Sequence, residues 1–211
     1  DELSSLGAGE CIPISEDLSS LEGINSLVSK IKNREPYIDV LVNNAGLGLA
    51  TPIDSLDVGD WDRVMDINAR SPRFLTQALL EPLRKNATQK DPSRVIFISS
   101  VAASMVFPSV LAYSSSKNIL EHLTKQLALA LSDDFIRVNA VAPGRLYSEM
   151  TRRAWQDPEA ESFKAELKRI PAHRYGELED MAGVAVMLCS RAGSYFHGEI
   201  LNLDGGFRLA F

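Results

Sequence analysis

The sequence of 211 residues contains little cysteine or histidine and no long apolar run. Its two cysteines, Cys11 and Cys189, lie far apart without a Cys-x-x-Cys motif, which favours reduced thiols over a disulfide or a metal site. No apolar run approaches the ~18 residues of a membrane span, and no signal peptide is visible, so we expect a cytoplasmic protein with no membrane partner. The three histidines lack the spacing of metal ligands, so we expect no metal and a structural or surface role for each: His122, His173 and His197.

A surplus of positive charge is also absent. The net charge is −6 and the isoelectric point is about 5.1, with no cluster of Lys and Arg, so we expect no nucleic-acid partner. A hydrophobic content of 45% and a charged content of 24% are ordinary for a globular protein. The length suits a single domain over residues 1–211.

Short apolar runs alternate with helical patterns along the chain. This alternation predicts an α/β fold with a doubly wound parallel sheet of the Rossmann-like kind, in three αβα layers. The predicted strands cover residues 11–14, 38–42, 95–98, 136–141 and 200–203, and the predicted helices cover 18–33, 60–85, 112–131 and 179–189. Residues 145–177 interrupt the alternation and carry more charge, which predicts an insertion over the mouth of a site.

The pair Tyr113 and Lys117 carries the clearest chemical signal. On a helix, residues four apart project from one face. A neighbouring cation favours the phenolate, so we expect Lys117 to lower a tyrosine pKa that is ordinarily ~10. A tyrosine tuned in this way can exchange protons near neutral pH, as carbonyl reduction or alcohol oxidation requires. The alternative is an ordinary Tyr and Lys on the surface of an amphipathic helix.

Taken in order, the motifs resemble those of the short-chain dehydrogenase/reductase family over nearly the whole chain. They include Ser100, thirteen residues before Tyr113, and a tail similar to that of bacterial and fungal 3-oxoacyl-reductase-like members, including rhamnolipid-type reductases. The resemblance implies NADP or NAD as cofactor, with NADP favoured, a small-molecule carbonyl or alcohol substrate, and a homodimer or homotetramer. The matching elements are Asp17-Leu18, Asn43-Asn44-Ala45-Gly46, Asn68, Ser100, Tyr113-x-x-x-Lys117, Pro143-Gly144 and Asp204-Gly205-Gly206.

The resemblance assigns catalytic roles to four residues. Tyr113 would be the general acid/base, and Lys117 would also bind the nicotinamide ribose. Ser100 follows a predicted strand and would hydrogen-bond the substrate oxygen, whereas we interpret Ser99 as a cap or turn residue. Asn68 would hold a water that passes protons to the lysine.

Cofactor contacts are implied at the ends of the predicted strands. Asn43, Asn44, Ala45 and Gly46 would line the adenosine ribose and brace the sheet, with an ordinary turn as the alternative. Pro143 and Gly144 would support the nicotinamide, and Ser148 stands where the family usually has a threonine, which keeps a hydroxyl there. Asp17, followed by Leu18, would face the adenine, and a role as helix N-cap is compatible with this.

One part of the family pattern is missing from the sequence. No Gly-x-x-x-Gly-x-Gly or Gly-x-Gly-x-x-Gly occurs, although the family holds the pyrophosphate on such a turn after its first strand. In the strand order 3-2-1-4-5-6, residues 11–14 and 38–42 would be strands three and four. We therefore expect the glycine turn and the first two strands to precede residue 1.

Other departures leave alternatives open. Pro72, flanked by Arg70 and Arg73, either fits a bend around Asn68 or displaces the proton relay, and the arginines alter a face that commonly packs on a second subunit. A catalytically silent scaffold or regulator is therefore one alternative function, and an epimerase or lyase is another. Arg145 has no role that we can assign. An apolar substrate wall, or plain core packing, is expected from four further residues: Met105, Phe107, Met150 and Trp155.

Overall fold

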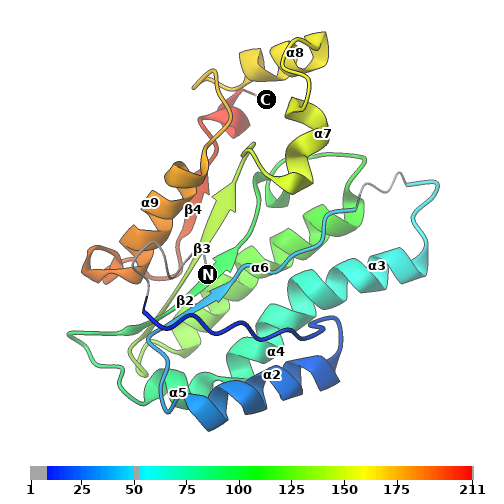
Figure 1. The fold of residues 1–211 in the computed structure, drawn as a ribbon. Helices are drawn as coiled ribbons and strands as arrows, with labels where there is room; N and C mark the ends of the chain where they lie inside the picture. The colour runs from blue at the N-terminus through cyan, green and yellow to red at the C-terminus, as the bar shows by residue number, and fades with distance from the viewer. Residues whose placement is uncertain (1–8, 50–52, 211) are drawn as a thin grey trace.

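The computed structural model describes residues 9–49 and 53–210, which form a parallel sheet with helices on both faces (Figure 1). Within these ranges, four strands lie in the spatial order β1-β2-β3-β4, and every neighbouring pair is parallel. The strands are β1 (Val40–Asn43), β2 (Ser93–Ile98), β3 (Ile136–Pro143) and β4 (Ile200–Leu203). The predicted fold class is confirmed.

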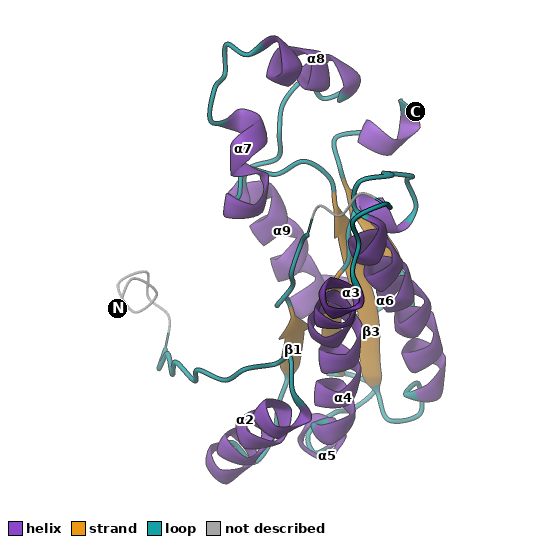
Figure 2. Cartoon of the chain, turned by 90° about the vertical axis from the view of Figure 1, so that its right-hand side faces the viewer, coloured by secondary structure: helices purple, strands orange, loops and turns teal. Residues whose placement is uncertain are grey.

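The two faces of the sheet are covered by different helices. Residues of α2 (Leu21–Arg34), α4 (Ser71–Ala78) and α6 (Leu111–Ala130) bury a large apolar cluster against one face, and α9 (Leu178–Cys189) packs on the other (Figure 2). Successive side chains of β2 therefore enter opposite clusters, with Phe97 in the first and Ile96 in the second. Burial on both faces explains why this strand is almost wholly apolar.

The structure corrects two predicted elements. The helix expected over 60–85 is divided into α3 (Val58–Met65), a π-helical turn at Asp66–Arg70, α4, and α5 (Leu80–Arg84). Pro72 stands at the start of α4, where its missing N–H is tolerated because the chain has just left the π-turn. Residues 11–14 form no strand, because no described segment pairs with their backbone groups.

Residues 145–177 rise from the carboxyl ends of the strands (Figure 1). They contain α7 (Arg152–Trp155) and α8 (Glu161–Arg169) and contribute Phe163, Ile170 and Tyr175 to a third apolar cluster. This cluster also holds buried side chains from outside the segment, Val101 and Phe207.

No helix in the described part of the chain combines the length and apolar character needed to cross a membrane.

Candidate active site

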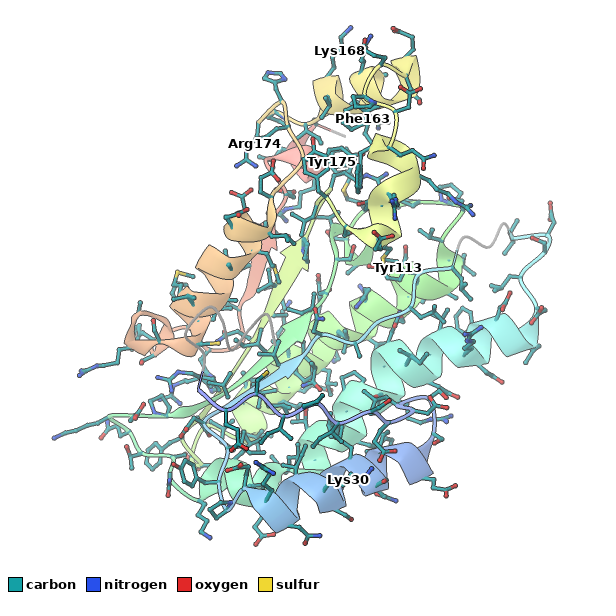
Figure 3. The ribbon with its side chains drawn as sticks, in the orientation of Figure 1. Lys30, Tyr113, Phe163, Lys168, Arg174 and Tyr175 are labelled. Carbon is teal, nitrogen blue, oxygen red and sulfur yellow. The ribbon has the colours of Figure 1, made fainter. Side chains whose placement is uncertain are left out.

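Tyr113, Lys117 and Ser100 meet at the carboxyl end of the sheet. Tyr113 lies in the first turn of α6, and its hydroxyl is hydrogen-bonded to Ser100. The Lys117 Nζ lies 5.6 Å from the centre of the Tyr113 ring. Figure 3 shows Tyr113 at the end of the sheet from which α7 and α8 rise. Parallel strands present ligand sites at this end, so the position agrees with a catalytic role.

The cap at the end of β2 is Ser100, so the interpretation of Ser99 as a cap is wrong. Ser100 caps the short helix Val101–Ala103, because its Oγ accepts a hydrogen bond from the Ala102 amide at 3.1 Å, and it also reaches Tyr113. Ser99 is not a cap. Its hydroxyl is 3.3 Å from the Lys117 carbonyl and 3.1 Å from Glu121 Oε1, which fastens β2 to α6.

Lys117 is buried, with 4% of its surface exposed. Its ammonium donates to the Ile98 carbonyl at 2.7 Å, which uses one of three N–H donors in the described structure. Burial lowers the pKa of Lys117 to about 8. The amine is therefore still largely cationic at neutral pH.

The pKa of Tyr113 differs from the expectation. Burial raises it above its ordinary value, and the hydrogen bond from Ser100 opposes this shift only in part. Because the Lys117 Nζ is directed at the Ile98 carbonyl and lies beside the ring, its charge does not overcome the cost of desolvating a phenolate. The phenol is accordingly protonated at neutral pH, the form that can donate a proton.

Asn68 lies in the middle of the π-turn and is fully buried. Its Oδ1 accepts from the Leu47 amide at 2.7 Å, and its Nδ2 donates to the Leu47 carbonyl at 2.9 Å and to Ser116 Oγ at 3.0 Å. Pro72 has no N–H, so the Asn68 carbonyl cannot receive the usual helical bond from four positions on. The π-turn and the proline thus fit together, which is the first of the two alternatives left open by the sequence.

The segment after β1 approaches the lysine closely. Asn43 Nδ2 donates to Thr76 Oγ1 at 3.2 Å and so braces β1 against α4, whereas Asn44, Ala45 and Gly46 are exposed. A Cβ on Gly46 would lie 3.4 Å from the Lys117 Nζ and 3.5 Å from Asn68 Oδ1. A larger residue at this position would therefore fill the space beside the ammonium.

The remaining predicted cofactor residues have local structural partners. Pro143 ends β3, and Gly144 donates from its amide to the Leu203 carbonyl at 2.9 Å. Ser148 is exposed and forms a capping box with Thr151.

At the other end of the predicted set, Asp17 accepts from the Ser19 amide at 2.9 Å. Ser20 is the N-cap of α2, so the proposed capping role of Asp17 is wrong: its carboxylate closes the turn that precedes the cap. Leu18 packs against the apolar cluster that α2, α4 and α6 share.

Sequence reasoning assigned nothing to Arg145, which the structure places in a partly buried polar group. Its Nη2 lies 2.6 Å from Glu166 Oε1, and its guanidinium is 5.9 Å from the centre of the Phe207 ring. The hydroxyl of the fully buried Tyr175 donates to the same carboxylate. Burial and this hydrogen bond raise the pKa of Tyr175. No spacing rule pairs residues 145, 166 and 175, so the sequence offered no signal for this group.

Three of the four expected wall residues, Met105, Phe107 and Trp155, pack against the third apolar cluster next to Val101. Tyr147 joins them, with its ring centre 5.5 Å from that of Trp155. The fourth, Met150, is 58% exposed and instead extends toward Gly48, on which a Cβ would lie 3.1 Å from the Met150 Sδ. The apolar cluster therefore begins one residue beyond Ser100, and the packing of these three side chains in it agrees with the core-packing alternative.

Comparison with known proteins agrees with this geometry. A family model described as Enoyl-(Acyl carrier protein) reductase matches residues 2–208. The Rhamnolipids biosynthesis 3-oxoacyl-(acyl-carrier-protein) reductase of Pseudomonas aeruginosa is 40% identical over 202 residues, which cover 95% of this chain and 78% of that protein. Gluconate 5-dehydrogenase of Gluconobacter oxydans is 30% identical, over 92% of this chain and 73% of its own. A solved Pseudomonas aeruginosa RhlG/NADP active-site complex has a TM-score of 0.91 at 39% identity and covers 98% of this chain and 79% of that one.

Proposed function

The chain belongs to the short-chain dehydrogenase/reductase family, as its motifs predicted, and we propose that it reduces the keto group of a 3-oxoacyl-type substrate with NADPH. The observation that carries the proposal is the convergence of Ser100, Tyr113 and Lys117 at the carboxyl end of the sheet, next to an apolar cluster. The preference for NADPH and for an acyl substrate rests on the reductase and the NADP complex named above.

The side chains of the site would each perform one part of the reaction. Tyr113, protonated at neutral pH, donates its proton to the carbonyl oxygen. Ser100 donates a hydrogen bond to the same oxygen as negative charge develops there. Lys117 stabilises the phenolate that remains on Tyr113, and Asn68 holds the loop at Leu47 beside it. The chemistry that a bound nicotinamide would supply is the hydride.

The residues present fit a dinucleotide at its nicotinamide ribose. Lys117 has N–H donors beyond the one that Ile98 accepts, and a ribose hydroxyl is a suitable acceptor. Gly46 leaves room beside that ammonium, and Asn44 and Ala45 are exposed next to it. These are the residues that would hold the cofactor.

Residues 145–177 would act as a lid in this reading. Their aromatic side chains form one apolar cluster with Val101, and an apolar lid suits an acyl chain better than a sugar acid. Homo-oligomerisation and a cytoplasmic location are part of the same proposal. Exposed apolar side chains on α4 and α6 support the former, and the free thiols of Cys11 and Cys189 support the latter.

The test is to follow nicotinamide absorbance with NADPH and NADH on a 3-oxoacyl thioester and on a keto-sugar acid. We expect faster oxidation of NADPH with the thioester, and a roughly 10²–10⁴-fold lower kcat for Tyr113→Phe at unchanged thermal stability. Turnover of the keto-sugar acid alone would refute the acyl proposal. If neither dinucleotide raises the melting temperature, the scaffold alternative is supported instead.

A further inference from the structure

Ser116 is a buried hydroxyl between two groups of the site. It lies in α6 three residues after Tyr113 and is fully buried. Its Oγ donates to the Tyr113 carbonyl at 2.7 Å and accepts from Asn68 Nδ2 at 3.0 Å. One hydroxyl therefore joins the π-turn to the helical turn that carries the tyrosine.

The direction of these bonds is determined by the chemistry of each group. The Leu47 amide can only donate, so it fixes Asn68 Oδ1 as acceptor and Nδ2 as donor. One Nδ2 hydrogen goes to the Leu47 carbonyl and the other to Ser116. The Ser116 hydrogen is then left for the Tyr113 carbonyl, which can only accept. Each hydrogen in this series of bonds has one acceptor, so an alternative arrangement would leave a buried polar atom unpaired.

The start of α6 needs such an anchor. Its N-cap, Val110, has no side chain that can accept from the first amides, and helix ends without a cap fray. Tyr113 lies in that uncapped first turn. A rotation of the turn would move the phenol relative to Ser100 and to Lys117. The Lys117 ammonium is held separately, by its hydrogen bond to the Ile98 carbonyl.

We propose that Ser116 is a positioning residue, through which Asn68 and the Leu47 loop hold the first turn of α6 and hence the Tyr113 hydroxyl in place. The expected loss of kcat rests on the proposed function, whereas the expected loosening of the first turn of α6 does not. The hydroxyl of Ser116 does not touch the reacting atoms.

The experiment compares Ser116→Ala with Ser115→Ala in the full-length protein. Ser115 is the neighbouring serine, and its hydroxyl forms no hydrogen bond within the described residues, so the two changes delete the same group in different surroundings. We expect Ser116→Ala to lower kcat roughly 10- to 100-fold with KM nearly unchanged, because small displacements of a catalytic group have effects of this order. Ser115→Ala should behave as the unmodified protein.

A double-mutant cycle with Asn68→Ala tests the connection. If Ser116 acts through Asn68, the double variant should have the kcat of Asn68→Ala alone, whereas independent multiplication of the two losses would overturn the proposal. Ser116→Thr, which keeps the hydroxyl, should recover most of the activity. If Ser116→Ala does not fold, Ser116→Cys replaces it with the same expectation.

Hydrogen exchange separates this proposal from the reductase assignment. The amide of Ser114, which donates to the Val110 carbonyl at 2.9 Å, and the amide of Leu47, which donates to Asn68, should exchange faster in Ser116→Ala and not in Ser115→Ala, with or without turnover. Unchanged exchange at both places would refute the positioning role even in an active enzyme. If the unmodified protein has no reductase activity but Ser116→Ala shows the faster exchange, only the reductase function is refuted.

Discussion

Replacing Glu166 by alanine should destabilise the protein well beyond the effect of deleting an exposed carboxylate. Glu166 accepts a hydrogen bond from the hydroxyl of the fully buried Tyr175. Leaving such a buried donor unpaired costs about 1–3 kcal/mol. The ion pair with Arg145 adds about 0–1 kcal/mol, because the arginine side chain is 35% exposed and water can replace the carboxylate. The two ranges add to about 1–4 kcal/mol, and we take the middle of that range, about 2–3 kcal/mol, as the expected loss in the free energy of unfolding.

Thermal unfolding followed by circular dichroism can measure this loss. For a domain of this size, 1 kcal/mol lowers the melting temperature by about 2–4 °C, so Glu166→Ala should melt roughly 5–10 °C lower. The matched control is Glu161→Ala in the same helix, whose side chain is 92% exposed and 3.7 Å from Lys164, and whose loss should change stability by less than about 0.5 kcal/mol. Equal shifts for the two variants would show that the buried hydroxyl does not depend on Glu166.

Three further predictions concern the strands, the site and the pH dependence. Gly144→Ala should lower the free energy of unfolding, measured by denaturant titration, by about 1–3 kcal/mol. The alanine Cβ would lie 2.7 Å from the Asp204 Cβ and force β3 and β4 apart. The kcat/KM for reduction should fall as pH rises through about 8, where Lys117 loses its charge, and Lys117→Arg should move this fall to higher pH. Burial, and secondarily Arg137, lower the pKa of His197 below 6.5 in the folded protein. On acidification the imidazole of the unfolded chain therefore binds a proton before that of the folded protein does. The stability that depends on neutral His197 should be present above pH 6.5 and be lost on acidification, and His197→Gln should flatten that part of the curve.

The sheet and the grouping of the site could be predicted because both depend on local periodicity and order. Apolar runs mark β2 and β3, and residues that follow parallel strands meet at one edge, which brought Ser100 near Tyr113. The π-turn at Asn68 was not predictable in this way, since one inserted residue leaves the apolar pattern of 60–85 almost unchanged. The strand expected at 11–14 failed because a strand exists only with a partner.

Long-range polar partners were the other part that sequence could not supply. Ser114, Ser115 and Ser116 are identical letters in a row, and only packing shows that Ser116 faces Asn68. The sign of the Tyr113 pKa shift depended on how deeply the phenol is buried and where the Lys117 Nζ points, neither of which spacing reveals.

Burial gives these positioning contacts their importance. In a site of low effective dielectric, the interaction of a charge with a neighbouring dipole varies more steeply with distance than it does in water. The Lys117 cation and a Tyr113 phenolate are both disfavoured by burial here, so each depends on a few fixed partners: the Ile98 carbonyl for the former and Ser100 for the latter. A displacement that water would compensate at a surface is not compensated in this crevice. The bonds from Ser99, Asn68 and Ser116 to the backbone of α6 and to the Leu47 loop therefore stabilise the geometry on which proton transfer depends.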